Sequence, residues 1–376
     1  MNMKILLLAV SLLMLSACGQ NEPPEEYVTG FAHGISGYVV SEVASYTVSE
    51  NILYEEPPKE PVPVEQPLNP YADIPFGYIA VNYIIYMNEN FYRRPPFTYR
   101  ELETAEWIVE TLLQMGHAYE NIQIQPFYLN DFIGAFGWNK DLMVRGGMFG
   151  DRTPRYYSQN VILTVPGQSE EIIIIGAHYD TVLYAGASDN ASGVALLLES
   201  AHRMRYIKNY HTLVYVFFGA EEIGLLGSRH FVNELSDTKS ENILFMLNAD
   251  VLFEGSYLVY VAGVDYDDSR TRTDNDLTRL WDTIAQEKYY QYGIKLFPYP
   301  YGMYYWHSDH IPFFINGFPV IMLSGLDRLP PYSFTPRILH TERDCFEYIE
   351  ASWPGKIEQN MWAFSIFLES VLLRTV

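Results

Sequence analysis

Short runs of almost uninterrupted apolar residues recur from residue 158 onwards, and segments with helical periodicity lie between them. The runs are SQNVILTV, EIIIIGAHYD, TLVYVFFGAEE, ILFMLNADV and FPVIML. Strands without polar residues on either face are typical of a parallel sheet that helices cover on both sides. We therefore expect an α/β fold with a mixed, largely parallel central sheet flanked by helices.

The helical segments agree with this expectation. Thr98 and Glu101 have the spacing of a capping box, and apolar residues then recur at helical intervals until Gly116. The segment NASGVALLLESAHRM, residues 190–204, predicts a second helix. Regular structure begins near Ile74, so residues 71–376 are expected to form one domain.

The first residues, MNMKILLLAVSLLMLSACGQ, are typical of a targeting segment. Lys4 supplies a positive charge, and the apolar stretch from Ile5 to Leu15 is too short to span a bilayer. LSAC resembles the bacterial lipoprotein signal, so residues 1–17 are predicted to be removed and Cys18 to be lipidated. An ordinary secretory signal is the alternative. Lipidation of Cys18 would leave Cys345, the second of two cysteines, without a disulfide partner.

Residues 18–70 show no sustained periodicity and contain six prolines between Pro57 and Pro70. Proline-rich segments favour extended polyproline geometry, so we predict a tether that lifts the following domain off a membrane. The expected location is the cell envelope, on an exported and lipid-anchored protein. The net charge of −22 makes nucleic acid an unfavourable partner.

Ionisable residues follow the predicted strands at the points where they end. In sheets of this class, functional residues collect beyond the carboxyl ends of the strands. The candidates come from five segments of the chain, and all are expected at one rim of the sheet: His178 and Asp180, Asp189, Glu221 and Glu222, Asp250, and His340 and Asp344.

Imidazole and carboxylate are the ligands that suit zinc. Three carboxylates among five ligands carry a charge of −3, which two Zn²⁺ ions and one hydroxide balance. That balance would make the adjacent Glu221 and Glu222 favourable at the end of a buried strand. Taken singly, these residues have other roles: Asp189 or Asn190 is a candidate helix N-cap, His178 a hydrogen-bonded core histidine and Asp250 the end of a strand.

The motifs GAHYDTV, GASDNASGVALLLE, FFGAEEIGLLGS, NADV, SDHIPFFINGFPVI and HTERD, in this order, resemble those of the co-catalytic dizinc aminopeptidases, which include bacterial leucyl aminopeptidases. With the helix RRPPFTYRELETAEWIVETLLQMG, the resemblance covers roughly residues 75 to 370. It implies that residues 71–376 are a catalytic domain that hydrolyses amino-terminal residues from peptides.

The resemblance also implies a role for each site residue. His178 and Asp250 would bind one zinc, Glu222 and His340 the other, and Asp189 would bridge them. Glu221 would be the general base for a water between the ions, and Asp180 would orient His178.

Two features depart from the family or go beyond it. Leu339 stands where some relatives have a tyrosine that stabilises the oxyanion. An aromatic-rich stretch, KYYQYGIKLFPYPYGMYYWHSDH, is interpreted either as a packed surface loop or as a wall of the substrate pocket. The pocket candidates in and beside it are Tyr304, Tyr305, Trp306 and Asp309. His307 and His310 are weaker candidates for metal ligands.

Two other functions stay open. A glutaminyl cyclase with a single zinc has the same fold, but cyclases typically have DGEE where this chain has GAEE, and tryptophan at the position of Leu339. A non-catalytic binding ectodomain is the third possibility, although such relatives usually lose ligands and all five candidates are present here.

Overall fold

The structure is a computed structural model that describes residues 73–128, 157–235, 240–255, 257–263, 274–299, 307–326 and 338–374. The predicted signal peptide and tether, including Cys18, lie outside these residues. Tyr304, Tyr305 and Trp306, three of the predicted pocket residues, also lie outside them. These assignments therefore remain predictions.

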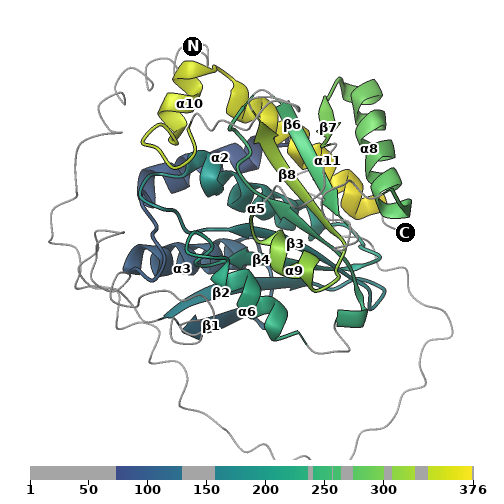
Figure 1. Cartoon of the computed structure of the whole chain (residues 1–376), viewed down its shortest axis with the longest axis horizontal. Helices are drawn as coiled ribbons and strands as arrows, with labels where there is room; N and C mark the ends of the chain where they lie inside the picture. Colours follow the sequence, from purple (N-terminus) through teal and green to yellow (C-terminus); the bar gives the residue numbers. More distant parts are fainter. Residues whose placement is uncertain are drawn as a thin grey trace, which may run out of the picture. The chain divides into compact units, whose positions relative to one another are not determined.

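An eight-stranded sheet forms the centre of the described domain (Figure 1). Its strands, in the order in which they lie side by side, are β1 (Ile122–Tyr128), β2 (Tyr157–Val165), β4 (Thr212–Phe218), β3 (Ile172–His178), β5 (Ile243–Ala249), β8 (Val320–Leu326), β6 (Tyr257–Gly263) and β7 (Leu296–Pro298). The four middle strands β4, β3, β5 and β8 run parallel, and β6 and β7 are parallel to each other. The pairs β1–β2, β2–β4 and β6–β8 are antiparallel. The predicted mixed, largely parallel sheet is confirmed.

Helices cover both faces of this sheet (Figure 1). They are α2 (Tyr78–Asn90), α3 (Tyr99–Gln114), α5 (Ser192–Met204), α6 (Leu226–Asn233), α8 (Asp276–Tyr292), α9 (His310–Ile315), α10 (Phe346–Ser352) and α11 (Lys356–Arg374). Short turns of helix also occur at Tyr119–Asn121 and Ala187–Ala191.

Alternate residues of β3 face two separate hydrophobic clusters. Ile173 and Ile175 pack in the larger cluster, to which α2, α3, α5, α8, α10 and α11 contribute. Ile174 packs in the smaller cluster, with Phe231 of α6 and Phe313 of α9. Because both faces of the strand are buried, its apolar run has no alternation in the sequence.

The predicted start of the first long helix is confirmed. The Thr98 hydroxyl accepts a hydrogen bond from the backbone N–H of Glu101 at 3.3 Å, which caps α3. Gly116 follows the end of this helix with a φ of +89°, a left-handed conformation that glycine adopts without strain.

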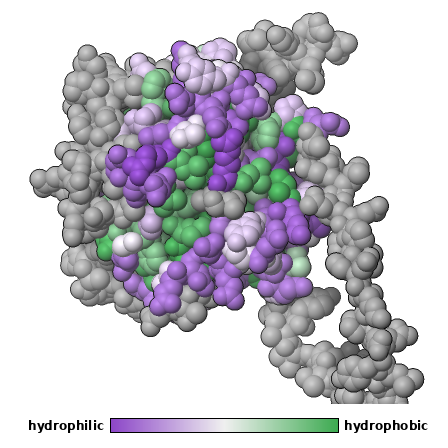
Figure 2. Space-filling model, turned by 90° about the vertical axis from the view of Figure 1, so that its right-hand side faces the viewer, coloured by the Kyte–Doolittle hydropathy of each residue, from purple (hydrophilic) through white to green (hydrophobic). Residues whose placement is uncertain are grey.

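The first part of the aromatic-rich stretch belongs to α8 and the edge strand β7. Tyr289, Tyr290 and Tyr292 lie on α8 and are exposed. The side of the molecule on which α8 lies in Figure 1 shows hydrophilic residues around a group of hydrophobic ones (Figure 2). This part of the stretch is therefore a surface helix, and the sheet order places β7 four strands away from β3.

Within the described ranges, no helix has the length and apolar character that crossing a membrane requires. Cys345 is buried and disulfide-bonded in the structure.

Candidate metal centre

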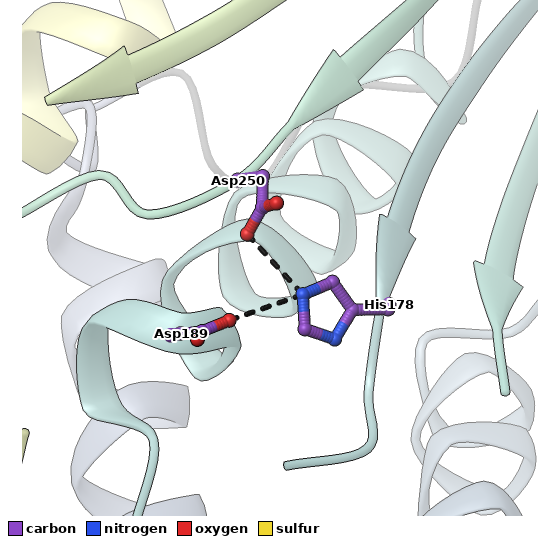
Figure 3. Close-up of side chains that lie close together, drawn as sticks. All are labelled: His178, Asp189 and Asp250. Atoms are coloured by element: carbon purple, nitrogen blue, oxygen red, sulfur yellow. Dashed lines mark hydrogen bonds and ion pairs between the residues drawn. The ribbon is translucent and has the colours of Figure 1, made fainter. Parts of the chain in front are cut away.

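His178 is the last residue of β3, and its two ring nitrogens face different partners. Nδ1 lies 3.1 Å from the backbone carbonyl oxygen of Asp180. Since a carbonyl oxygen only accepts, this contact assigns a proton to Nδ1. Nε2 points between two carboxylates, 3.1 Å from Asp189 Oδ1 and 3.2 Å from Asp250 Oδ1 (Figure 3). This arrangement directs Nε2 to the position that a metal ion would take.

Asp189 connects this group to a second one. While its Oδ1 faces His178, its Oδ2 lies 3.0 Å from Nε2 of His340. The same His340 nitrogen lies 3.1 Å from Glu222 Oε2. Two sets of three side chains result, and each set has ligand atoms that lie within 4.8 Å of one another: His178, Asp189 and Asp250, and Asp189, Glu222 and His340.

The five side chains that the sequence singles out as ligands are thus gathered at one place. Asp189 is the only residue that belongs to both sets among the described residues. The alternative role of Asp189 as a helix cap is taken by its neighbour, because Asn190 Oδ1 accepts a hydrogen bond from the backbone N–H of Gly193 at 2.9 Å.

The ionisable groups at the site have strongly shifted pKa values. Burial raises the pKa of Glu222 to about 8. Hydrogen bonds with Asp189 and Glu222 raise the pKa of His340 to about 10. Burial alone would lower the pKa of His178, but the nearby carboxylates, Asp250 foremost, raise it well above its usual value. Protons on the histidines therefore balance the carboxylates when no metal is bound.

The residues present fit a pair of zinc ions. Two imidazoles and three carboxylates form a donor set that zinc prefers. Glu222 Oε1 is buried and has no hydrogen-bond partner, which leaves one carboxylate oxygen available to a cation. An unpaired buried carboxylate oxygen is costly unless a cation binds it.

Glu221 lies beside the two groups but belongs to neither. Burial raises its pKa well above the usual value, and the nearby Asp309, Glu222 and Asp250 add to this effect, while His178 opposes it. A carboxyl group that lies beside a metal site without belonging to its ligand sets is suited to transfer a proton there.

The carboxylate of Asp180 holds the segment that carries the paired glutamates. Its Oδ1 and Oδ2 accept hydrogen bonds from the backbone N–H groups of Glu221 and Glu222, both at 3.1 Å. Its backbone carbonyl accepts from His178, and Asp180 Oδ1 lies 3.6 Å from the same nitrogen. Asp180 therefore connects the end of β3 to the end of β4.

Two further buried carboxylates hold the other ligand-bearing segments. Asp344 accepts from the backbone N–H groups of Ser188, at 2.6 Å, and Asp189, at 3.0 Å. Glu254 accepts from the backbone N–H of Leu339 at 3.0 Å, immediately before His340. Each of these contacts fixes a backbone segment directly beside a candidate ligand.

Arg94 is fully buried beneath the site. Its guanidinium donates to backbone carbonyl oxygens of Phe91, Tyr179, Ala185 and Gly186. Burial lowers its pKa to about 10, although Asp344 and Asp180 act in the opposite direction, and at that value it stays charged at neutral pH. Arg94 thus fixes both ends of the loop between His178 and Asp189.

Three residues at the site adopt the left-handed backbone conformation without being glycine. They are Ala220, Val251 and His340, with φ values of 53°, 56° and 56°. Each is a candidate ligand or the direct neighbour of a candidate site residue. Such conformations cost free energy and are typically retained at functional sites.

A pocket adjoins the second group of ligands. Its lining consists of Thr181, Val182, Leu183, Tyr184, Gly186, Asp189, Glu222, His340 and Asp344. Of the predicted pocket residues, only Asp309 is described. It is fully buried, and burial raises its pKa to about 7, with Asp180 and Asp250 adding to the effect. It is not among the residues that line this pocket.

The weaker candidates for metal ligands stay outside the two groups. His307 is exposed, whereas His310 is buried at the start of α9. Residues that sequence reasoning missed are Arg94 and Glu254, which had no local signal. Glu101 had one, because its capping-box spacing identified it as a structural residue.

The largely parallel middle of the sheet thus gathers two overlapping His–carboxylate groups that could hold metal ions. The model of Peptidase family M28 matches residues 160–365, more than half of the chain. The chain belongs to this family.

Relatives with this sequence pattern include "Aminopeptidase YwaD" of Bacillus subtilis, 33% identical over 185 residues, which are 48% of this chain and 37% of that protein. Another is "Probable lipoprotein aminopeptidase LpqL" of Mycobacterium tuberculosis, 39% identical over 103 residues, which are 27% of this chain and 21% of that protein. The chain therefore matches well under half of the length of these relatives.

Solved structures have the same fold. A zinc aminopeptidase from Bacillus subtilis is similar with a TM-score of 0.61 at 18% identity, over 80% of this chain and 96% of that one. A glutaminyl cyclase from an Acidobacteriales bacterium has a TM-score of 0.55 at 20% identity, over 85% of this chain and 100% of that one. At these identities the likeness establishes the fold, which aminopeptidases and cyclases share.

Proposed function

We propose that this chain is a zinc-dependent aminopeptidase that hydrolyses the peptide bond next to a free amino terminus. The observation that carries the proposal is the position of Asp189, whose two carboxylate oxygens face His178 and His340 in two separate ligand groups. A single-metal site has no need for such a bridging carboxylate. Family membership and the names of the aminopeptidase relatives support the same activity.

In the proposed reaction, His178 and Asp250 would hold one zinc ion, Glu222 and His340 would hold the other, and Asp189 would contribute to both sites. Bound zinc supplies Lewis acidity at the scissile carbonyl group and lowers the pKa of a nearby water molecule. The donor set supports this assignment, because three carboxyl groups and two imidazoles gather in two groups that share Asp189.

Glu221 is the proposed general base. Its carboxylate accepts a proton from the water whose oxygen attacks the carbonyl carbon, and the protonated carboxyl group then gives that proton to the amine as the C–N bond breaks. The Asp180 carboxylate accepts a hydrogen bond from the backbone N–H of Glu221 and so keeps Glu221 in place. The backbone carbonyl of Asp180 accepts the Nδ1 proton of His178, which leaves Nε2 for the metal side.

The direct test combines metal analysis with substrate profiling of the purified protein. We expect close to two zinc ions per chain, hydrolysis of aminoacyl-anilides, and loss of activity with a chelator that added zinc reverses. One tightly bound zinc at saturation with full activity would contradict the two-ion site.

The runner-up is a glutaminyl-peptide cyclotransferase with one zinc. The structural likeness to a glutaminyl cyclase favours keeping it as an alternative, whereas the bridging position of Asp189 speaks against it. Cyclisation of amino-terminal glutamine with no release of amino acids would establish this alternative. Zinc binding without either activity would favour a non-catalytic binding ectodomain.

We also propose that the protein is exported and anchored to the cell envelope by a lipid on Cys18. The LSAC motif and the name of the LpqL relative support this location. Peptides with a free amino terminus would then be cleaved outside the cytoplasm.

A further inference from the structure

Glu101 occupies the capping-box position of α3, but its side chain does not close the box. In a capping box the acidic side chain returns to the backbone N–H of the capping residue, here Thr98. Instead, Glu101 Oε2 accepts from the backbone N–H of Phe97 at 2.5 Å, and Oε1 points away from its own helix. Only 2% of the residue's surface is exposed.

Oε1 of Glu101 reaches the segment that carries the paired glutamates. It accepts from the Ser158 hydroxyl at 2.6 Å and from the backbone N–H of Ala220 at 3.0 Å. Ser158 lies on β2 and Ala220 follows β4, so one carboxylate joins α3 to two strand segments. Burying a carboxylate is costly, and these three donors offset that cost.

Three consecutive backbone N–H groups are therefore held by two buried carboxylates. Ala220 donates to Glu101, and Glu221 and Glu222 donate to Asp180. Ala220 has the left-handed φ of 53°, a conformation that reverses the chain just before the two glutamates. A residue with a β-carbon stays in this conformation only when its surroundings enforce it.

The segment has little freedom to relax. A β-carbon added at Gly219 would lie 2.4 Å from the Ser158 hydroxyl and 2.6 Å from the carbonyl oxygen of Gln159. The carbonyl of Ala220 accepts from Leu226 N at 3.1 Å. A shift at Ala220 must therefore move Glu221 and Glu222 with it.

We propose that Glu101 is a positioning residue for the catalytic site, which sets the placement of Glu221 and Glu222 through the backbone of Ala220. This role rests on the proposed function, in which Glu221 is the base and Glu222 a zinc ligand. Glu101 touches neither substrate nor metal, and it acts only through the segment that it holds.

Two substitutions in the full chain separate this role from helix capping. Glu101→Gln keeps the length of the side chain and one oxygen for Ala220, whereas Glu101→Asp keeps the charge and loses the reach. A capping role in the first turn is served well by aspartate, because a negative charge there is favourable. If Glu101 positions the segment at Ala220, Glu101→Asp should impair the protein more than Glu101→Gln. If Glu101 only caps α3, Glu101→Gln should impair it more.

We expect Glu101→Asp to lower kcat and the zinc affinity of one of the two sites by about 10- to 100-fold, which is typical when support of a metal ligand is lost. KM should stay nearly constant, and Glu101→Gln should keep kcat within about tenfold of the unchanged chain. The absorption spectrum of the cobalt-substituted protein should change for Glu101→Asp. Glu103→Gln, an exposed glutamate on the same helix, is the matched control.

Thr98→Ala is the control for stability, because it removes the cap of α3 without touching Ala220. If Glu101→Asp behaves like the unchanged chain while Glu101→Gln is impaired, or if Glu101→Asp differs from Thr98→Ala only in Tm, the positioning role is refuted. If the unchanged chain hydrolyses no peptide substrate, the proposed function fails, and the zinc titration and the cobalt spectrum still decide the role of Glu101.

Discussion

The carboxylate of Asp344 accepts a hydrogen bond from the backbone N–H of Asp189 at 3.0 Å. The side chain of one acidic residue thus binds the backbone of another. Burial raises the pKa of Asp344 to about 7, and the charge of Asp189 adds to this effect. Asp344 follows His340 by four residues, so the segment that supplies one candidate ligand also supports another. The two ligand groups are coupled through this short segment.

Asp344→Ala should therefore weaken zinc binding at both sites. Losing a residue that orients a ligand typically costs about 10- to 100-fold in metal affinity. A zinc titration followed by calorimetry would measure this effect, and Glu342→Ala, an exposed neighbour, is the matched control. Equal zinc affinities in both variants would show that Asp344 does not support Asp189.

Arg94→Lys should destabilise the domain although the charge is kept. Lysine cannot donate to four carbonyl oxygens in the planar geometry of arginine. We expect a loss of roughly 3 kcal/mol in the free energy of unfolding, because hydrogen bonds of a charged group are lost and buried carbonyls stay unpaired. Chemical denaturation would measure it. Arg93→Lys at the exposed neighbouring position should have almost no effect, and a similar loss there would contradict this account.

The stability of the metal-free protein should fall as the pH rises from about 7 to about 9.5. The pKa of Glu222 is raised to about 8 and that of His340 to about 10, so in this range the folded state binds more protons than the unfolded state. Stability is therefore present at lower pH and is lost as pH rises through these values. Burial lowers the pKa values of His117 and His310. These two histidines therefore change the stability only at pH values below the usual histidine pKa.

Thermal unfolding with and without zinc measures this pH dependence. Zinc binding requires deprotonated ligands, so zinc should raise the Tm more at pH 9 than at pH 7. A metal-free Tm that stays constant or rises across this range would contradict the charge balance described for the site.

Cys18→Ser should move the protein from the membrane fraction to the soluble or secreted one if Cys18 carries a lipid, because stable anchoring depends on the acyl chains. The disulfide of Cys345 in the structure makes a thiol count equally informative. A lipidated chain should show one free thiol after denaturation without reductant. No free thiol, together with an unchanged distribution of Cys18→Ser, would refute the lipid anchor.

The sequence allowed prediction of the central sheet because its middle strands are buried on both faces and contain few polar residues. The same property located the candidate ligands, since the first polar residues after β3, β4 and β5 stand at one rim. Asp189 lies in the short helical turn Ala187–Ala191 and His340 in a turn near the end of the chain, and both were candidates because their residue types suit a metal ion at the same rim. For the strands and for the candidate ligands alike, the prediction rested on residues that are neighbours in the sequence.

Residues that act over long sequence distances were not predictable in this way. Arg94 lies 85 residues from Tyr179, whose carbonyl it binds, and an isolated arginine gives no sign of burial. Glu101 was predicted to cap a helix because its spacing fits, yet its carboxylate binds Ala220, 119 residues away. Tyr289 to Tyr292 belong to a stretch for which the sequence left a surface loop and a pocket wall open, and they form the exposed end of α8, because aromatic residues alone do not distinguish a surface helix from either.

The central claim is that Glu222 binds zinc and Glu221 moves the proton. Glu221→Gln keeps the size of the side chain and removes the proton acceptor, so it should keep its zinc and lose about 10² to 10⁴ in kcat. Glu222→Gln removes a charged ligand, so it should lose zinc from one site, and added zinc should restore part of its activity.

The most direct measurement is therefore the number of zinc ions bound per chain, together with kcat, for these two variants at increasing zinc concentration. The account predicts an inactive Glu221→Gln protein with the zinc content of the unchanged chain, and a Glu222→Gln protein that lacks one zinc until zinc is added in excess. A zinc-depleted Glu221→Gln protein beside a fully loaded Glu222→Gln protein would contradict it, and full activity in both would refute the proposed enzyme.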